Sequence, residues 1–197
     1  MKILNRLMAA FRKLPGVGPR QAERFAMHYL RASNAEIEEL VLSLREMKSS
    51  IRMCRQCLTY CDKELCSICD DSSRDKTSIC VVEDAQDIDA VEKTGTFRGV
   101  YHVLHGAISP VDGVGPDAVR IKELVARIKR ANPPVTELII ATDPDTEGEA
   151  TALYIADLLR NDVPSITRLA YGMPLGGDID YTDEMTLSFA LRGRVKL

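Results

Sequence analysis

The sequence predicts an α/β protein with a helical N-terminal domain, a small four-cysteine finger, a parallel-sheet domain and a short C-terminal tail. Apolar residues first recur at the spacing of amphipathic helices. Two CxxC pairs follow, and short apolar runs then alternate with helical patterns, which favours a doubly wound parallel sheet. The expected boundaries of these four parts are 1–53, 54–77, 78–176 and 177–197.

The composition is that of an ordinary globular protein. The chain has 197 residues, of which 45% are hydrophobic and 28% charged, enough for one compact domain with small appendages. Arg6, Arg12 and Lys13 interrupt the N-terminal apolar residues, so this segment does not read as a signal peptide. No apolar run approaches the roughly 20 residues that span a bilayer, so no membrane partner is expected. We expect a cytoplasmic protein with reduced thiols.

The charge is unevenly distributed along the chain. Residues 1–60 hold eleven Lys/Arg against five Asp/Glu, whereas residues 61–197 hold fifteen against twenty-four. A basic N-terminal part indicates contact with a polyanion. The alternative is a chance segregation of solvated charge.

Three helices are expected in the N-terminal part. The first spans residues 3–13, and the second spans roughly 19–30. Ser33 and Glu36 form the pattern of a capping box that opens the third helix. The apolar stripe of the third helix consists of Ile37, Leu40, Val41, Leu44 and Met47. These helices offer too little core to be stable comfortably alone.

The connection between the first two helices, LPGVGPR, is typical of a phosphate-gripping hairpin. Gly16 and Gly18 allow backbone conformations closed to other residues and let a phosphate approach. A helix N-terminus that follows presents free N–H groups, and Arg20 and Arg24 lie one turn apart on one face. We therefore predict DNA binding at these four residues. The alternative is an ordinary tight turn with solvent-facing arginines.

The same tetrapeptide, GVGP, recurs at residues 113–116. Asp112 and Asp117 flank this copy and would repel phosphate. It is predicted to be a loop followed by a helix that begins at proline.

Four cysteines have the spacing of a structural zinc site. They are Cys54, Cys57, Cys66 and Cys69. Two CxxC pairs place four thiolates around one tetrahedral Zn²⁺ and leave no position open for substrate. The alternative, two disulfides, is disfavoured in a reducing compartment. Cys61 can compete as a ligand but belongs to neither pair, and Cys80 lies in an apolar run that predicts a core position.

The second half of the chain alternates between predicted strands and helices. Buried strands are expected at SICVVE, VYHVLHG, ELIIAT and TRLAYG. Helices are expected near 85–93, 117–131 and 147–160. In the tail, Thr182 is expected to cap a last short helix, and the end of the chain to pair as an edge or swapped strand.

Acidic residues follow two of these strands. They are Glu83, Asp143, Asp145 and Glu147. Ligand sites of open parallel sheets form at the carboxyl ends of strands, so the first three converge if the strands are neighbours. Oxygen ligands with open positions suit Mg²⁺. The alternative is helix capping by Asp145 or Thr146, with the glutamates favouring the positive end of the helix.

The order of these motifs resembles a known family. Glu83 followed by DPDTEGE resembles a Toprim domain, a Rossmann-like parallel-sheet fold. Preceded by a helix-hairpin-helix and a four-cysteine zinc finger, the whole chain resembles the RecR family of bacterial recombination mediators. The resemblance rests on LPGVGPRQAERFAMHYL, CRQC with CSIC, ICVVEDAQDI, HGAISPVDGVGP, ATDPDTEGEATA and GMPLGGDIDYTDEMTL.

The resemblance implies a nucleoid-associated DNA-repair protein without catalysis. Such proteins form an oligomeric clamp (a dimer or tetramer ring) on single- or double-stranded DNA without sequence preference. They act with RecO and RecF to load RecA onto DNA covered by single-strand-binding protein. By motif match, Arg20 and Arg24 are the DNA-binding residues, the four cysteines hold zinc, and the acidic residues bind Mg²⁺ or RecO.

The alternative function is a Mg²⁺-dependent Toprim nuclease or topoisomerase-like enzyme. Topoisomerase relatives carry arginine where this chain has Thr146. They also need a tyrosine nucleophile in a large separate domain. These departures favour the non-enzymatic interpretation.

Overall fold

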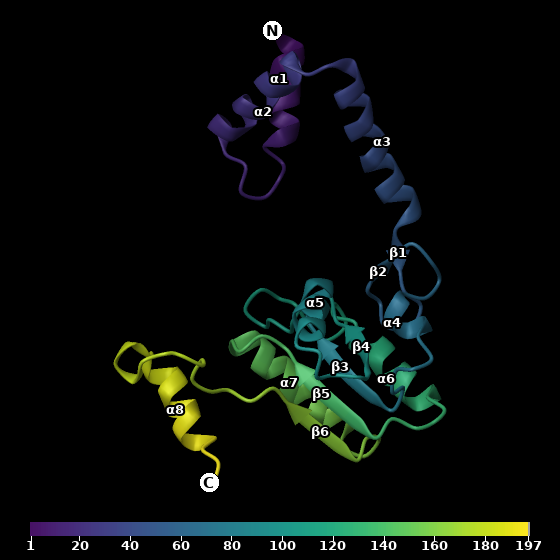
Figure 1. Ribbon diagram of the computed structural model, residues 1–197, viewed down its shortest axis with the longest axis vertical. Helices are drawn as coiled ribbons and strands as arrows, with labels where there is room; N and C mark the ends of the chain where they lie inside the picture. The colour runs from purple at the N-terminus through teal and green to yellow at the C-terminus, as the bar shows by residue number, and fades with distance from the viewer. Residues whose placement is uncertain (197) are drawn as a thin grey trace. The chain divides into compact units, whose positions relative to one another are not determined.

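The computed structural model describes residues 1–196. The chain forms two compact units, Met1–Ile51 and Arg52–Leu197. Their internal elements are drawn in Figure 1.

The first unit consists of three helices, as predicted. They are α1 (Lys2–Phe11), α2 (Pro19–Arg31) and α3 (Asn34–Ser50). Phe11 packs α1 against α2, with ring centroids 5.8 Å from Phe25 and 5.9 Å from Tyr29. The predicted capping box of α3 is confirmed: the Glu36 amide donates to Ser33 Oγ at 3.3 Å, and the Ser33 amide donates to the Glu36 carboxylate at 2.8 Å.

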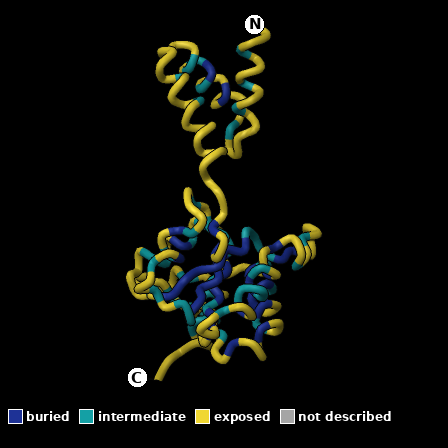
Figure 2. Tube along the Cα trace, turned by 90° about the vertical axis from the view of Figure 1, so that its right-hand side faces the viewer, coloured by how far each residue is buried: buried dark blue, intermediate teal, exposed yellow. Residues whose placement is uncertain are grey.

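The core of the first unit is small. Ala22 and Ala26 are its buried hydrophobic residues. The predicted apolar stripe of α3 is not buried within the chain, since Leu44 and Met47 are 53% and 55% exposed. Figure 2 shows this unit mostly in the colour of exposed residues. The periodicity of α3 identified the helix correctly, but its apolar face is only partly covered within one chain, where Ile37 and Val41 are half-buried.

The second unit begins with the cysteine finger. A two-residue strand, β1 (Arg52–Met53), pairs antiparallel with β2 (Tyr60–Cys61). A single helical turn, α4 (Ser67–Asp70), follows Cys66, which is its N-cap. This hairpin and turn carry the two CxxC pairs.

A four-stranded parallel sheet forms the centre of the second unit, which confirms the predicted fold class. Its strands are β3 (Ser78–Val82), β4 (Val100–Val103), β5 (Glu137–Ala141) and β6 (Ser165–Arg168), in the order β4-β3-β5-β6. All five residues of β3 are buried, as expected for a central strand covered on both faces. The last strand was predicted too late, at TRLAYG, and as buried. Most of β6 is exposed, because it is an edge strand.

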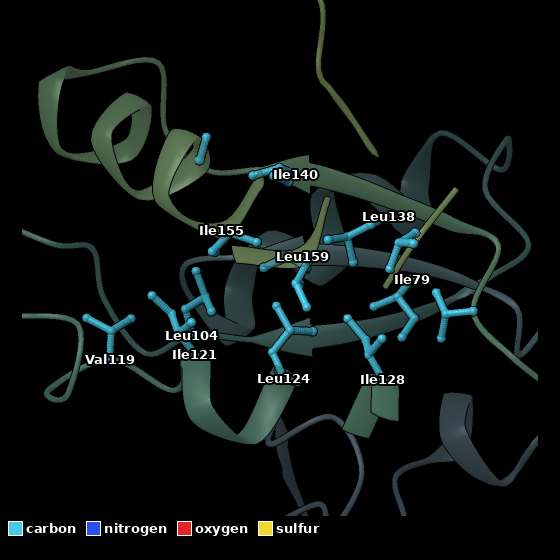
Figure 3. Close-up of a cluster of buried hydrophobic side chains, with 14 of the residues drawn as sticks. Ile79, Leu104, Val119, Ile121, Leu124, Ile128, Leu138, Ile140, Ile155 and Leu159 are labelled. Atoms are coloured by element: carbon cyan, nitrogen blue, oxygen red, sulfur yellow. The ribbon is translucent and has the colours of Figure 1, made fainter. Parts of the chain in front are cut away.

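Helices cover both faces of this sheet. On one face, α5 (Ala85–Lys93) packs Ile88 against Val82 and Val103. The other face carries α6 (Ile121–Arg130) and α7 (Thr146–Leu159). Their buried side chains, among them Leu124 and Leu159, pack on the sheet in the larger core shown in Figure 3. The doubly wound arrangement fixes where the carboxyl ends of the strands meet.

The segment before α6 differs from its prediction. The second GVGP is a loop, as predicted, with a bridge between Ser109 and Val114. The helix, however, begins at Ile121 and not at proline. Turns occupy the residues between, and Asp117 forms an ion pair with Lys122 at 2.8 Å instead of entering the helix.

The tail contains a short 3-10 turn, η1 (Ile179–Tyr181), and a last helix, α8 (Glu184–Arg192). The predicted cap at Thr182 is wrong: the Asp183 carboxylate accepts the Thr186 amide at 2.9 Å. The Thr182 hydroxyl instead donates to the Asp178 carbonyl at 2.9 Å. In residues 177–196 the tail is helical and irregular and does not pair as an edge strand of this chain's own sheet; the swapped strand stays a prediction. As far as residue 196, no helix has both the length and the apolar character needed to cross a membrane.

Candidate functional sites

The hairpin between α1 and α2 is open and pre-shaped. Gly16 has φ +76°, a conformation that L side chains rarely adopt. The Val17 amide donates to the Leu14 carbonyl at 3.2 Å and closes the turn. A Cβ atom built on Gly16 or Gly18 would meet nothing within 4 Å. The approach to the backbone is therefore unobstructed from the protein side.

The start of α2 is suited to binding an anion. Gly18 is its N-cap and has no side chain, so no side-chain cap occupies the first amides. Pro19 stands at the start of the helix. The remaining amides of the first turn have no partner within the helix, and they carry the positive end of its dipole. A phosphate oxygen can accept from these groups.

A basic face continues along α2 from this N-terminus. Arg20 and Arg24 lie in one shallow depression that Arg31 and His28 also line, together with Glu23. Arg20, Arg24 and Arg31 are exposed, and within residues 1–196 none of them forms an ion pair. Sequence reasoning missed Arg31, although continuing the helical spacing beyond Arg24 would have placed it on this face.

The four predicted zinc ligands come together as expected. The sulfur atoms of Cys54, Cys57, Cys66 and Cys69 all lie within 4.8 Å of one another. Sulfurs bound at ~2.3 Å to a central tetrahedral zinc would lie about 3.8 Å apart, so the cluster fits the metal. Hydrogen bonds from the neighbouring thiols of Cys57 and Cys69 lower the pKa of Cys66. Zinc bound here would be structural, because four protein ligands complete its coordination.

The other two cysteines lie outside this cluster. The Cys61 thiol donates to the Lys63 carbonyl at 3.0 Å. Cys80 is buried in β3, and burial raises the pKa of its thiol to about 12. Cys80 is therefore a neutral core residue, as predicted.

The acidic residues lie where the strand order reverses. The chain passes from β3 to β4 on one side and returns to β5 on the other, so β3 and β5 are neighbours. Glu83 follows β3 and Asp143 follows β5, and the Asp143 amide donates to the Glu83 carboxylate at 3.0 Å. Burial raises the pKa of Glu83, and repulsion from Asp143 and Asp145 acts in the same direction. The predicted convergence of Glu83 with Asp143 is thus present in the structure.

Two of the remaining acids, Asp145 and Glu149, have partners for their carboxylates. The Asp145 carboxylate caps α7 by accepting the Gly148 amide at 2.7 Å, so the capping interpretation holds for this residue. Glu147, half-buried, lies in the first turn of α7. Glu149 pairs with Arg168 and accepts from the Tyr171 hydroxyl at 3.2 Å. In the part of the chain that the structure describes, the cysteine thiols are the one compact group of three or more metal-type ligands.

Gly148, which sequence reasoning missed, holds the acidic site together. A Cβ atom at this position would lie 2.1 Å from the Asp143 carbonyl oxygen and 2.9 Å from a Glu83 carboxylate oxygen. Only glycine therefore lets the first turn of α7 approach the end of β5 so closely. An isolated glycine inside a helical pattern was the signal available in the sequence.

Comparison with known proteins agrees with the order of the hairpin and the acidic site. The family models that match are "RecR, helix-hairpin-helix" over residues 4–53, "Toprim domain" over 77–170 and "RecR, C-terminal" over 172–195. The chain is 50% identical to "Recombination protein RecR" of Streptomyces coelicolor, over 98% of this chain and 96% of the relative. It is 46% identical to the protein of the same name from Natranaerobius thermophilus, over 100% and 98%. With that of Nocardia farcinica the identity is 52%, over 92% of each chain.

Proposed function

Because the chain belongs to the RecR family of recombination proteins, we propose that it is a DNA-binding mediator of recombinational repair and not an enzyme. It binds single- and double-stranded DNA without sequence preference. It acts with RecO and RecF to load RecA onto DNA covered by single-strand-binding protein, in the cytoplasm at the nucleoid. These finer roles follow from the family resemblance.

The observation that carries this proposal is the hairpin at the start of α2. Open glycines, uncapped amides and the exposed Arg20 and Arg24 all face solvent together. Such groups contact phosphate oxygens, which are the same for every sequence. The site therefore supports gripping a backbone without reading bases.

A homo-oligomer, a dimer or tetramer ring, belongs to the same proposal. A groove within the first unit is lined by apolar residues from all three helices, including Leu7, Leu40 and Leu44. These three side chains are exposed in the single chain. A second copy of the chain would cover them, and several copies would multiply the number of phosphates gripped.

The acidic site takes the role of a partner surface in this proposal. Glu83, Asp143, Asp145 and Glu147 present negative charge at the ends of β3 and β5. Complementary charge favours a basic partner such as RecO. The same oxygens are of the type that Mg²⁺ prefers.

DNA binding at several salt concentrations tests the hairpin. The double variant Arg20→Ala/Arg24→Ala removes two phosphate contacts per chain, and each contact contributes about 0.9 to the slope of log affinity against log salt on duplex DNA. We expect a weaker affinity and a slope lower by about 1.8 per chain engaged, measured by fluorescence anisotropy. Arg45→Ala, an exposed arginine on α3, is the matched control. An unchanged slope in the double variant would exclude this interface.

The enzymatic alternative rests on one observation, the convergence of Glu83 and Asp143 at the switch point of the sheet. A Mg²⁺-dependent nuclease or topoisomerase-like enzyme would cut or relax plasmid DNA and lose this activity in Asp143→Asn. The mediator proposal expects intact DNA with and without Mg²⁺, and unchanged DNA affinity in this variant. Mg²⁺-dependent breaks that disappear in Asp143→Asn would refute the mediator proposal and support the enzymatic alternative.

A further inference from the structure

A cavity within the second unit is lined by residues of the finger, of α6 and of the segment after α6. Its volume is about 740 Å³, and small-molecule sites typically measure roughly 300–1,000 Å³. The described residues that line it include none from the hairpin, the four-cysteine cluster or the acidic site. The proposed function therefore leaves this cavity without a role.

The wall of this cavity is basic. Four cationic side chains line it, against one carboxylate among the described residues, that of Glu123. Glu123 is engaged by Arg120 at 2.8 Å, outside the cavity wall. Arg55, the first of the four cations, is engaged by Glu64 at 2.6 Å. The other three cations are Lys76, Arg127 and Arg130.

These three cations lack a carboxylate partner. Within residues 1–196 none of them forms an ion pair. The Lys76 ammonium donates to the Cys69 carbonyl at 2.6 Å, and the Arg127 guanidinium donates to the Tyr101 carbonyl. A carbonyl oxygen positions a cation but does not neutralise it. Because Lys76 and Arg127 are also half-buried, a negative group in the cavity would offset a real desolvation cost.

The rest of the wall suits a flat group that has apolar faces and polar edges. Ile79 and Val135 are buried residues of the wall, and the finger contributes Leu58. The exposed amides of Gln56 and Asn132 line the cavity as well. Amide side chains of this kind hydrogen-bond the edges of nucleobases, whereas arginine and lysine bind phosphate oxygens. Cations, amides and an apolar wall in one cavity are together the groups that recognise a nucleotide.

We propose that this cavity is a nucleotide-binding site, in which Lys76, Arg127 and Arg130 hold the phosphates and the apolar wall takes the base. The nucleotide is either free in solution or the end of a single DNA strand, since both carry the same two groups. The site is separate from the hairpin, because the hairpin belongs to the first compact unit and the cavity to the second. Loss of either site therefore leaves the other testable.

Isothermal titration calorimetry of the zinc-loaded full-length chain with ADP tests the site. Arg130→Gln is the main variant, because Arg130 is exposed and its loss should spare the fold. Lys129→Gln is the matched control: Lys129 precedes Arg130 on α6, is equally exposed and does not line the cavity. Ala126→Leu fills part of the cavity without changing its charge. Inorganic pyrophosphate, titrated in parallel, measures how much the base contributes.

We expect the affinity for ADP to fall at least tenfold in Arg130→Gln, which loses a charge-assisted hydrogen bond to phosphate, and in Ala126→Leu, where the base is excluded. Lys129→Gln should stay within about threefold of wild type. Equal losses in Arg130→Gln and Lys129→Gln would overturn the proposal, because they would indicate a general field. Unchanged binding in Ala126→Leu, or pyrophosphate binding as tightly as ADP, would equally overturn it.

A short single-stranded oligonucleotide with a 5′-phosphate distinguishes the two sources of the nucleotide. It is titrated into the Arg20→Ala/Arg24→Ala variant, so that the hairpin of the proposed function does not contribute. If the ligand is a strand end, the oligonucleotide binds more tightly than ADP, and adding Arg130→Gln weakens it at least tenfold. If the ligand is a free nucleotide, ADP binds more tightly than the oligonucleotide. The proposal is overturned if neither ligand binds.

Discussion

Gly148→Ala is a sharp test of the geometry of the acidic site. In an exposed helix interior this change would stabilise the helix by up to about 1 kcal/mol, since alanine is the better helix former. Here the added methyl group would lie 2.1 Å from the Asp143 carbonyl oxygen and 2.9 Å from the Glu83 carboxylate. The first of these contacts is with backbone, which cannot rotate away. Helix propensity therefore predicts that Gly148→Ala stabilises the protein, whereas packing predicts that it destabilises the protein.

The packing term is the larger one. Forcing extra volume into a tight contact costs typically 1–3 kcal/mol. Moving α7 away would also weaken the Asp145 cap at 2.7 Å and the bond from the Thr142 hydroxyl to the Gly148 carbonyl at 2.9 Å. A lost cap costs about 1 kcal/mol. After subtracting the gain in propensity, we expect a net destabilisation of about 1–3 kcal/mol.

Thermal and urea unfolding followed by circular dichroism measure this effect. For a chain of this size, 1 kcal/mol corresponds to about 2–4 °C in Tm, so the expected fall is roughly 2–12 °C. Gly172→Ala is the control, because a Cβ atom there meets nothing within 4 Å. If Gly148→Ala is as stable as wild type or more so, the close approach of α7 to β5 is not real.

Two further predictions concern the metal centre and the acidic pair. Cys54→Ser should lose zinc, whereas Cys61→Ser should retain one zinc per chain. Metal analysis of the purified variants measures this difference. Loss of zinc in Cys61→Ser would mean that the ligand set is wrong. Burial, and then repulsion from Asp143 and Asp145, raise the pKa of Glu83 in the folded protein. Protonated Glu83 therefore favours the folded state, and this contribution to stability is lost as the pH rises through the raised pKa. Glu83→Gln should therefore raise Tm at pH 8, and the gain should vanish below about pH 4, where the unfolded carboxyl is protonated too; a gain independent of pH would point to another cause.

Features that depend on a few consecutive residues could be predicted from the sequence. The capping box of Ser33 and Glu36 formed as expected, because both hydrogen bonds lie within one turn. The two CxxC pairs closed into one cluster, since the spacing itself limits how the thiols can meet. The requirement for glycine at position 16 followed from its turn, where φ is positive.

Where local signals compete, the sequence alone could not decide. Thr182 and Asp183 are both good caps and stand next to each other, and the helix begins after Asp183 because its carboxylate reaches the Thr186 amide. At the start of α6, Pro116 is a plausible first residue, yet Asp117 pairs with Lys122 outside the helix. In β6, pairing with β5 sets the strand at Ser165–Arg168, against the apolar pattern that placed it later.

The sequence by itself determined the elements, their order and the chemistry of the zinc ligands, because period, capping and spacing act over a few residues. Only the tertiary structure decided which distant groups meet. The strand order brings Glu83 beside Asp143, 60 residues away, and leaves room there for glycine alone at position 148. Such pairs depend on how the sheet is wound and what each helix covers, and no local pattern encodes either.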